Sequence, residues 1–591
     1  MSAGAAGGGA ARLGSEGRPT NGPARDLDRL LADHPLTGAL DDRVRAGVAA
    51  VAEVVELGSG EVLVREGEPG DAAYLMTAGR LVATVDGAEV GVIVRGETVG
   101  EMALITGEVR TATVTACRPS RLVRIGADQF ATVLAAHPDA YRGLTSLLVE
   151  RLERTLRGRP TWIGHATVVG LASADRHLSR GFADSLSAAL EAEGARVGRF
   201  YGSDGGTLGP DSRRLADLEA ANDIVLVTAS DAALSGDTHG CDRTLLVARV
   251  DRPIPDVPAG RFSDVVLVHP PSTGLPSGTA RWLDRLVPTR RHHHLRDGSA
   301  RDLASLARRL LYRERVLVLG GGGARGLAHL GTYRALYETG VDIDAVYGVS
   351  AGAVFGAEVA LDRTPEQAIE RAASSLIDAP SLVDLTVPVV ALSSGRRVTD
   401  TLRNGFEGID LEDLWRPMTC LSTDLASLSA RVHHRGPLWR AVRASVAVPG
   451  VFPPLVEGDA VLVDGGVVDN LPVARARRLH PGAIVISSDV GRRHEILTAD
   501  FPPDGVIGGL RTTWERVGQR RRKAGLVKLL YRLTALGGGA LEAEEGDIHI
   551  DHRLEGIGMF DFAGARPAID AGYRLTLQVL EEAADLLPRG R

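Results

Sequence analysis

Residues 316 to 357 read VLVLGGGGARGLAHLGTYRALYETGVDIDAVYGVSAGAVFGA, and this stretch decides the fold of the chain around it. An apolar run from Val316 is followed by a glycine-rich turn, a helical pattern, a second apolar run and a second glycine-bearing turn around Ser350. Apolar runs that alternate with helical segments are typical of a parallel sheet built from strand-helix-strand units. We therefore expect two parallel strands here, each ending in a tight turn.

The second turn has the form Gly-x-Ser-x-Gly, which at a strand end is the nucleophile elbow of serine hydrolases. Gly348 and Gly352 permit the sharp turn that exposes the hydroxyl of Ser350, the candidate nucleophile. If the two strands are neighbours, backbone amides of the first turn converge near this serine and can stabilise an oxyanion. The candidate donors are the amides of Gly321, Gly322 and Gly323.

The first turn has a second interpretation when it is taken alone. Gly321-x-Gly323-x-x-Gly326 matches the dinucleotide-binding fingerprint, and Asp342 or Asp344 lies near the spacing of a ribose-binding acid. That fingerprint is weak by itself, and the Gly-x-Ser-x-Gly motif one strand later favours acyl transfer over nicotinamide chemistry.

A serine nucleophile needs a base, and the segment AVLVDGG at 460–466 places Asp464 at the end of an apolar run before two glycines. Asp489, at the end of VISSD, is the alternative acid, and its other interpretation is a loop carboxylate. A Ser/His/Asp triad stays open, although none of the downstream histidines has a comparable strand-end setting. These are His480, His494, His549 and His552.

The motifs GGGGARG, GVSAG and DGG, in this order, resemble the patatin-like phospholipases, and the segments 417–425 and 444–454 add to the similarity. The resemblance implies an α/β hydrolase domain with a mostly parallel sheet over 314–480, and a C-terminal part of the catalytic region over 481–591. It also implies that Ser350 attacks an acyl ester and Asp464 takes its proton, with no required cofactor. Arg325 supports the oxyanion loop or steers a phosphate headgroup, or is structural.

The segment 36–157 consists first of short alternating runs punctuated by glycines, which predicts a β-roll. Its stretches 66–74 and 99–113 resemble the cyclic nucleotide-binding domain, with Val109 where that family often has proline. The resemblance implies cAMP or cGMP as a regulatory ligand, and a roll that only packs is the alternative. The candidate binding residues are Gly100, Glu101, Ala103, Arg110 and Thr111.

Between these regions, residues 161–297 alternate strand-like and helical runs, which predicts a Rossmann-like α/β linker domain without a glycine-rich phosphate loop. The run His292-His293-His294 is interpreted as loop residues whose side chains diverge, so no metal site is predicted. Together the three regions resemble the neuropathy target esterase group, whose activity is phospholipid and lysophospholipid deacylation. The alternative is a non-enzymatic cyclic nucleotide sensor, which would need a helix-turn-helix that the sequence lacks.

Composition sets the remaining expectations for this chain of 591 residues. A net charge of −7 offers no global basic field, so we exclude nucleic acid as a partner. Three cysteines, far apart and odd in number, favour a reducing compartment. With no signal peptide or transmembrane helix in the pattern, we expect a cytoplasmic protein. Residues 1–25, rich in Gly, Ala and Pro, are expected to form a disordered tail. The basic amphipathic segment 511–532, which contains tryptophan and leucine, is the candidate peripheral contact with membranes. The oligomeric state is not indicated.

Overall fold

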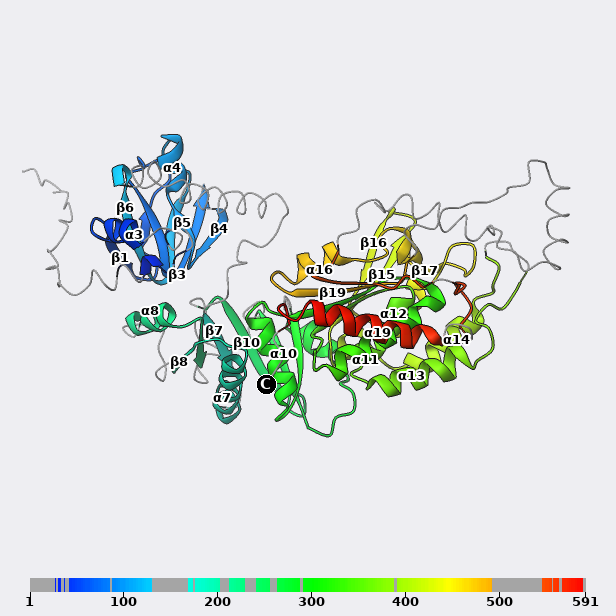
Figure 1. Ribbon diagram of the computed structural model, residues 1–591. Coiled ribbons are helices and arrows are strands. Elements are labelled where there is room, and N and C mark those ends of the chain that lie inside the picture. Colours follow the sequence, from blue (N-terminus) through cyan, green and yellow to red (C-terminus); the bar gives the residue numbers. More distant parts are fainter. Residues whose placement is uncertain are drawn as a thin grey trace, which may run out of the picture. The chain divides into compact units, whose positions relative to one another are not determined.

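The computed structural model describes residues 42–85, 88–129, 168–173, 176–201, 212–228, 241–255, 263–286, 291–386, 391–491, 545–554, 556–562 and 566–587, with a few positions between 27 and 37. They form two compact units (Figure 1). The N-terminal unit contains the described residues up to 129 and also 212–221, and the C-terminal unit contains the others. The sequence predictions for 1–25, 130–157 and 511–532 fall on residues outside these ranges.

The N-terminal unit is an antiparallel β-roll, which confirms the prediction. Its long strands β3 (Ala72–Val85) and β6 (Thr113–Gly126) pair with each other at the centre of the order β1-β6-β3-β4. Buried and partly exposed residues alternate along β6, the period expected of a strand with one face on a core. The remaining elements are β1 (Glu53–Leu57), β2 (Val62–Val64), β4 (Ala88–Val94), β5 (Thr98–Val99), α3 (Asp42–Ala49) and α4 (Glu101–Thr106).

Helix α8 (Ser212–Ala221) belongs to this unit although it lies far from the roll in the sequence. A carboxylate oxygen of Glu219 lies 2.8 Å from a guanidinium nitrogen of Arg118 on β6, and both side chains are about 1% exposed. The other carboxylate oxygen accepts the backbone amide of Gly79 at 2.9 Å. The predicted linker domain therefore contributes one helix to the nucleotide-type roll, held by a buried and doubly satisfied carboxylate.

The C-terminal unit begins with a parallel six-stranded sheet in the order β12-β11-β10-β7-β9-β8. The predicted α/β character is confirmed, and the order differs from the Rossmann order in that the second and third strands of the chain exchange places. Most positions of its strands are buried, as expected for a parallel sheet covered on both faces. The elements are β7 (Val168–Ala172), β8 (Val197–Tyr201), β9 (Ile224–Thr228), β10 (Arg243–Arg249), β11 (Asp264–His269), β12 (Arg291–Arg296), α7 (Arg176–Ala192) and α9 (Ala280–Arg285).

The histidine run lies in a strand, so the prediction of a loop is wrong. In β12 the alternation of side chains sends His292 and His294 to one face, where both ring Nε2 atoms approach the carbonyl of Glu412. His293 points to the other face and lies 3.1 Å from a carboxylate oxygen of Asp264. Backbone pairing with β11 makes the run a strand. Three consecutive polar residues did not indicate a strand in the sequence.

A second, mostly parallel sheet carries the first motif of the sequence. Its order is β17-β18-β15-β14-β13-β19-β20, with β16 paired to β15, and helices cover it, including α19 packed against α11 (Figure 1). The strands are β13 (Arg315–Leu319), β14 (Ala345–Val349), β15 (Met418–Asp424), β16 (Ser429–His433), β17 (Leu455–Glu457), β18 (Ala460–Asp464), β19 (Ile484–Asp489) and β20 (Ile548–Asp551). The helices are α10 (Ala300–Leu310), α11 (Ala328–Glu338), α12 (Ala351–Ala360), α13 (Pro365–Ala372), α14 (Arg396–Phe406), α15 (Leu438–Ser445), α16 (Val473–Leu479) and α19 (Pro567–Glu582). None of the described helices is both long and apolar enough to cross a membrane.

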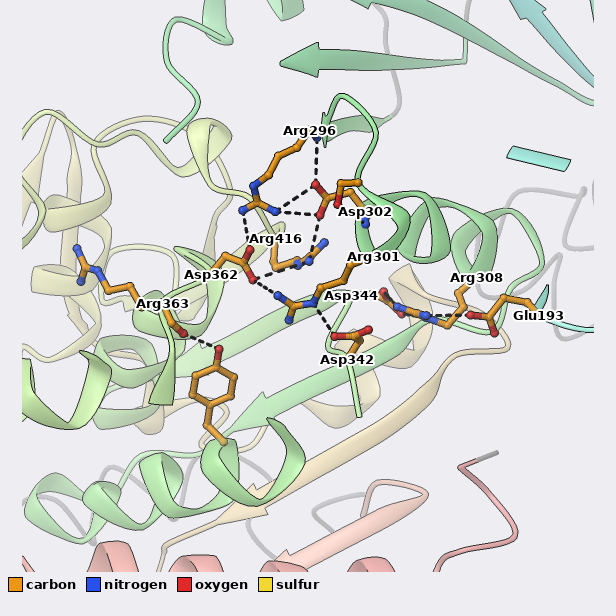
Figure 2. A network of polar contacts seen from close by, with 12 residues as sticks. Glu193, Arg296, Arg301, Asp302, Arg308, Asp342, Asp344, Asp362, Arg363 and Arg416 are labelled. Atoms are coloured by element: carbon orange, nitrogen blue, oxygen red, sulfur yellow. Dashed lines mark hydrogen bonds and ion pairs between the residues drawn. The ribbon is translucent and has the colours of Figure 1, made fainter. Parts of the chain in front are cut away.

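An ion-pair network joins the two sheets of the C-terminal unit (Figure 2). Asp362, which follows α12, accepts Arg296 from the end of β12 at 2.6 Å and Arg301 from α10 at 2.8 Å. Asp302 is almost fully buried and pairs with Arg296 at 3.1 Å and Arg416 at 3.2 Å. Because each buried carboxylate has more than one guanidinium partner, its desolvation is compensated, and the linker domain is anchored to the second sheet.

The same network answers the dinucleotide interpretation. Asp342 lies 2.6 Å from Arg301, and Asp344 receives two bonds from Arg308, the shorter at 2.7 Å (Figure 2). Asp344 is completely buried in this pair. Both candidate ribose-binding carboxylates therefore form ion pairs with arginines of this chain, which disfavours the dinucleotide-binding interpretation.

Candidate active site

Ser350 stands at the turn between β14 and α12 in a strained backbone conformation. Its φ is +53°, a region that side-chain-bearing residues rarely adopt. The backbone amide of Ser350 donates to Oγ of Ser445 at 2.9 Å, and Ser445 in turn donates to the carbonyl of Leu421 at 2.6 Å. These two bonds hold the turn, so the serine hydroxyl is presented from a backbone that cannot relax.

The flanking glycines allow helix α12 to approach the sheet. A Cβ atom at position 352 would lie 2.1 Å from the carbonyl oxygen of Leu319 on β13. A Cβ atom at position 348 would lie 2.6 Å from backbone atoms of the first turn of α12. Both positions therefore exclude any larger residue without a shift of the helix that follows Ser350.

The glycine-rich turn lies beside Ser350 because β13 and β14 are neighbouring parallel strands, with Leu319 level with Gly348. The amide of Gly321 donates to the carbonyl of Asn470 at 3.3 Å. Within the described residues the amides of Gly322 and Gly323 have no acceptor, and both residues line the same cavity as Ser350. The structure thus leaves two of the three predicted amides available to an oxyanion.

Gly321 contributes by close approach, because a Cβ atom there would lie 3.0 Å from Cβ of Ser350. Gly323 has φ +61°, and a Cβ atom at this position would lie 2.2 Å from the carbonyl oxygen of Met559. That carbonyl accepts the amide of Ala324 at 2.7 Å. The C-terminal segment around Met559 therefore pins the loop, which the motifs of the sequence did not indicate.

Asp464 ends β18 on the same level of the sheet as the serine. Val349 is level with Leu421 on β15, and the next residue, Ser422, is level with Asp464. Asp464 is completely buried, and its Oδ1 accepts the amide of Gly466 at 2.8 Å. No hydrogen bond from the described part of the chain is formed to Oδ2. One carboxylate oxygen is therefore fixed and the other is open to a proton.

The environment of Asp464 makes it a stronger base than an ordinary aspartate. Burial raises its pKa to about 6, against a smaller lowering by the neighbouring Ser350 hydroxyl and the Gly466 amide. A carboxylate with this pKa is largely ionised at neutral pH and still accepts a proton more readily than one in water. Direct transfer from Ser350 to Asp464 is chemically reasonable without a histidine.

An apolar cavity of about 710 Å³, including its open mouth, begins at Ser350. Apart from Ser350 and Thr401, its lining offers no polar side chain, which suits a hydrocarbon chain. A second hollow shares part of this lining and continues to Glu358 and Arg371. The apolar residues common to both are Val354, Phe355, Leu376 and Leu402.

The other acid and Arg325 have structural contacts. Oδ1 of Asp489 accepts the amide of Gly491 at 2.7 Å at the end of β19. Nε of Arg325 donates to the carbonyl of Val490 at 2.9 Å, and the side chain is 8% exposed. This contact favours the interpretation of Arg325 as a support of the loops around the site.

The histidines do not supply a triad within the described residues. His552 directly follows β20, and its Nε2 lies 3.0 Å from Oγ of Ser488 and 3.1 Å from Oγ1 of Thr332. His480 contacts Glu314 and His549 contacts Ser487, while His494 lies outside the described ranges. None of the three described histidines forms a hydrogen bond to Ser350 or Asp464.

Sequence reasoning missed two polar residues beneath the oxyanion loop. His329 is 1% exposed, and its Nε2 donates to the carbonyl of Gly320 at 2.9 Å while Nδ1 lies 2.8 Å from Oγ of Ser488. Burial lowers its pKa to about 4, so the ring is neutral, and because a carbonyl only accepts, Nε2 carries the proton. Nδ2 of Asn470 donates to the carbonyl of Gly321 at 3.1 Å. A polar residue on the buried face of a helical pattern was the available signal for His329.

The predicted nucleotide-binding residues lie around the start of α4 in the N-terminal unit. Gly100, with φ +84°, precedes α4, and the carbonyl of Gly100 accepts Nη1 of Arg110 at 3.0 Å. Nη2 of Arg110 donates to the carbonyl of Ala72 at 2.8 Å and to Asp71 at 3.1 Å. The arginine is thus held in place beside the start of a helix, where free amides favour an anion.

The other predicted nucleotide-binding residues differ in exposure. Glu101 and Ala103 on α4 are 1% and 5% exposed, whereas Thr111 is exposed. Glu101 and Arg110 are both buried, and Arg110 donates to two backbone carbonyls and to Asp71.

Comparisons with known proteins agree with this geometry. Residues 317–477 match the family described as Patatin-like phospholipase, and residues 54–137 match the Cyclic nucleotide-binding domain. The chain is 31% identical over 585 residues to an uncharacterized NTE family protein of Mycobacterium tuberculosis, covering 95% of this chain and 98% of that one.

Two animal relatives are longer than this chain. Neuropathy target esterase sws of Drosophila melanogaster is 29% identical, with 76% of this chain and 36% of the relative covered. Patatin-like phospholipase domain-containing protein 7 of Rattus norvegicus is also 29% identical, with 78% of this chain and 40% of the relative covered. The chain therefore spans less than half the length of these two relatives.

Proposed function

Because the chain belongs to the NTE family of patatin-like phospholipases, we propose that Ser350 and Asp464 are the catalytic dyad of a hydrolase that removes acyl chains from phospholipids and lysophospholipids. The protein is a serine esterase that acts on lipids, which leaves the alternative of a non-enzymatic sensor without support. The single observation that carries the dyad is a strained serine that lines an apolar cavity and neighbours a buried carboxylate, one oxygen of which accepts no hydrogen bond from the described residues.

The proposed reaction follows from the positions of these groups. Oγ of Ser350 attacks the ester carbonyl as its proton passes to Oδ2 of Asp464, and the amides of Gly322 and Gly323 stabilise the oxyanion. The carbonyl then reforms, and the lysophospholipid or glycerophosphodiester alcohol leaves with the proton held by Asp464. Water then loses a proton to the freed carboxylate and attacks the acyl-serine, the bond from the carbonyl to Oγ breaks, and Asp464 returns the proton to Oγ of Ser350 as the fatty acid leaves. No step requires a metal or cofactor.

The apolar cavity binds the acyl chain in this proposal, and the headgroup stays at the mouth. A hydrocarbon chain fits a lining without charged groups, because no polar atom of the protein has to be desolvated against it.

Hydrolysis of lysophosphatidylcholine and phosphatidylcholine by the wild type, Ser350→Ala and Asp464→Asn tests the dyad. We expect both variants to lose at least about a thousandfold in kcat, because the nucleophile or its base is removed. Asp424→Asn is the matched control, since Asp424 is also a carboxylate at a strand end but only binds loop amides and a hydroxyl. Full turnover by Ser350→Ala would refute the proposed chemistry.

We further propose that the N-terminal unit binds cAMP or cGMP and that the bound nucleotide changes turnover. The support is the match of residues 54–137 to the Cyclic nucleotide-binding domain, together with Glu101 at the start of α4 and Arg110 bonded to Gly100, since a carboxylate can accept a ribose hydroxyl and a guanidinium can bind a cyclic phosphate. Calorimetry of the full chain with each nucleotide should show binding by the wild type and none by Arg110→Gln. Absence of binding by the wild type would mean that the roll only packs.

A further inference from the structure

A hairpin forms part of the wall of the apolar cavity and continues beyond it. Its two described sides, residues 382–386 and 391–395, are called the rim hairpin here. Leu385 pairs with Ser393 in an antiparallel bridge, and the amide of Thr386 donates to the carbonyl of Leu392 at 3.0 Å. Leu382 lines the cavity, and the amide of Leu392 donates to the carbonyl of Gly450 at 3.0 Å. The rim hairpin is therefore fixed to the cavity wall.

Large apolar side chains of the rim hairpin are exposed to water. Leu385 is 81% exposed and Leu392 is 37% exposed, and Phe560, which lines the cavity, is 36% exposed. None of the described residues at this end of the rim hairpin is charged: they are Leu385, Thr386, Ala391 and Leu392. Exposed leucines beside the entrance of an apolar cavity mark an interaction surface rather than a core.

A set of hydrogen bonds to Asp384 holds this exposed conformation. The carboxylate of Asp384 accepts the hydroxyls of Ser393 and Ser394 and the amides of Gly395 and Arg396, the amides at 3.1 and 3.2 Å. Burial acts to raise the pKa of Asp384, but the hydroxyl and amide bonds hold it below its usual range. The conformation of the base of the rim hairpin is therefore fixed by the hydrogen bonds of Asp384.

Two cations adjoin the rim hairpin at the start of α14. Arg396 and Arg397 are the first two residues of α14, and both are exposed. The carboxylate of Asp384 accepts the backbone amides of both residues and offsets the positive end of the helix dipole. Neither arginine forms an ion pair with a carboxylate of the described residues, and Nη1 of Arg397 donates to the carbonyl of Ser381 at 3.2 Å. Their charges are available to an external anion.

We propose that the rim hairpin together with Arg396 and Arg397 is the surface by which the protein docks on an anionic lipid bilayer. Leu385 and Leu392 enter the interface, and the arginines contact lipid phosphates, which places the mouth of the cavity against its substrate. The choice of a bilayer as occupant rests on the proposed function and on the combination of leucines, cations and an apolar cavity in one place. This contact is separate from the one that the sequence predicted over 511–532.

Vesicle sedimentation of the full chain tests the surface. Ser350→Ala serves as background so that lipid is not consumed, and the vesicles are phosphatidylcholine alone or an equal mixture with phosphatidylglycerol. We expect Leu385→Ser with Leu392→Ser to weaken binding to both vesicles about tenfold or more. Leu428→Ser is the matched control, because Leu428 is 80% exposed at the turn between β15 and β16 and should leave binding within about twofold.

The charge variant isolates the headgroup contact. Arg396→Gln with Arg397→Gln should weaken binding to the mixed vesicles about tenfold, and by much less on phosphatidylcholine alone. Arg574→Gln on α19, an exposed arginine of the same unit, is its control. Equal loss on both vesicles would contradict the contact with lipid phosphates.

Hydrolysis of a soluble short-chain ester, measured in the wild-type background, separates this inference from the dyad. The double variant Leu385→Ser with Leu392→Ser should lose activity on vesicles but keep its activity on the soluble ester. The soluble ester has to enter the cavity but does not require docking on a bilayer. The proposed surface is overturned if the wild type does not sediment with mixed vesicles, or if the leucine variant binds as well as the Leu428 control. Failure of the dyad appears instead as soluble-ester turnover by Ser350→Ala.

Discussion

Replacing Asp464 by asparagine should abolish turnover and at the same time stabilise the C-terminal unit at neutral pH. The asparagine keeps the shape of the side chain and an oxygen that can accept the amide of Gly466. It removes the charge that the wild type must hold in a completely buried position. The substitution therefore separates what the carboxylate does for chemistry from what it costs the fold.

The magnitude follows from the pKa of the carboxyl. Folding raises the pKa of Asp464 from 3.8 to about 6, chiefly by burial. Between these two pH values the unfolded chain has released a proton that the folded chain retains, so the free energy of unfolding decreases as pH rises. The decrease is complete above about pH 6 and amounts to about 3 kcal/mol, at 1.36 kcal/mol for each pKa unit.

Thermal unfolding of wild type and variant from about pH 3 to about pH 8 measures this effect, since the two limits bracket the pKa values of 3.8 and about 6. The two proteins should unfold alike at the acidic end, and the variant should unfold a few degrees higher at the alkaline end. In parallel, kcat/KM of the wild type should rise with pH through about 6 and then level off, because only the ionised base accepts the serine proton.

Two results would refute this reasoning. A stability difference that does not change with pH would show that the carboxyl has an ordinary pKa in the folded protein. A variant that is less stable than the wild type at pH 8 would show that ionised Asp464 is stabilised by the fold. Asp424 is half-buried, and hydrogen bonds from backbone amides and the Ser427 hydroxyl lower its pKa, so Asp424→Asn should lose stability above pH 4, the opposite sign.

Three further predictions concern the surroundings of the site. His329→Ala removes the donor to the carbonyl of Gly320, so kcat should decrease about tenfold with KM nearly unchanged. Partial recovery of kcat in His329→Asn would support a positioning role for His329. A change in KM alone would contradict that role. Gly352→Ala would place a Cβ atom 2.1 Å from a backbone oxygen, which should destabilise the unit by about 1–3 kcal/mol and lower turnover, as measured by denaturant unfolding and ester hydrolysis. Asp362→Asn removes the charge that Arg296 and Arg301 share, although they keep Asp302 and Asp342 as partners, and should cost about 1–3 kcal/mol in denaturant unfolding with kcat little changed. An unaltered midpoint would show that the shared carboxylate is not stabilising.

The sequence determined the elements of this protein that depend on neighbours along the chain. Apolar runs separated by helical patterns predicted the strands β13 and β14, because a parallel strand that is buried on both faces has apolar side chains throughout. The pattern around Ser350 predicted the elbow, because only small residues at 348 and 352 tolerate the approach of the next helix. The β-roll followed in the same way from short alternating runs and glycine turns.

Other features were decided by tertiary structure alone, since they depend on residues far apart in the chain. The raised pKa of Asp464 arises from complete burial by several elements, and the docking of α8 on the roll depends on Arg118 and Glu219, which are 101 positions apart. The histidine run became a strand because β11 supplied its hydrogen bonds.

The rim hairpin shows the same division most clearly. Its leucines look like an ordinary apolar strand in the sequence, and only their exposure beside the cavity distinguishes them from core residues. Local chemistry sets which conformations a segment can adopt, whereas desolvation, exposure and the pairing of charges depend on what the rest of the chain brings to it. The sequence by itself therefore determined where a nucleophile could stand, and the tertiary structure decided how strong its base is and which surface surrounds its substrate.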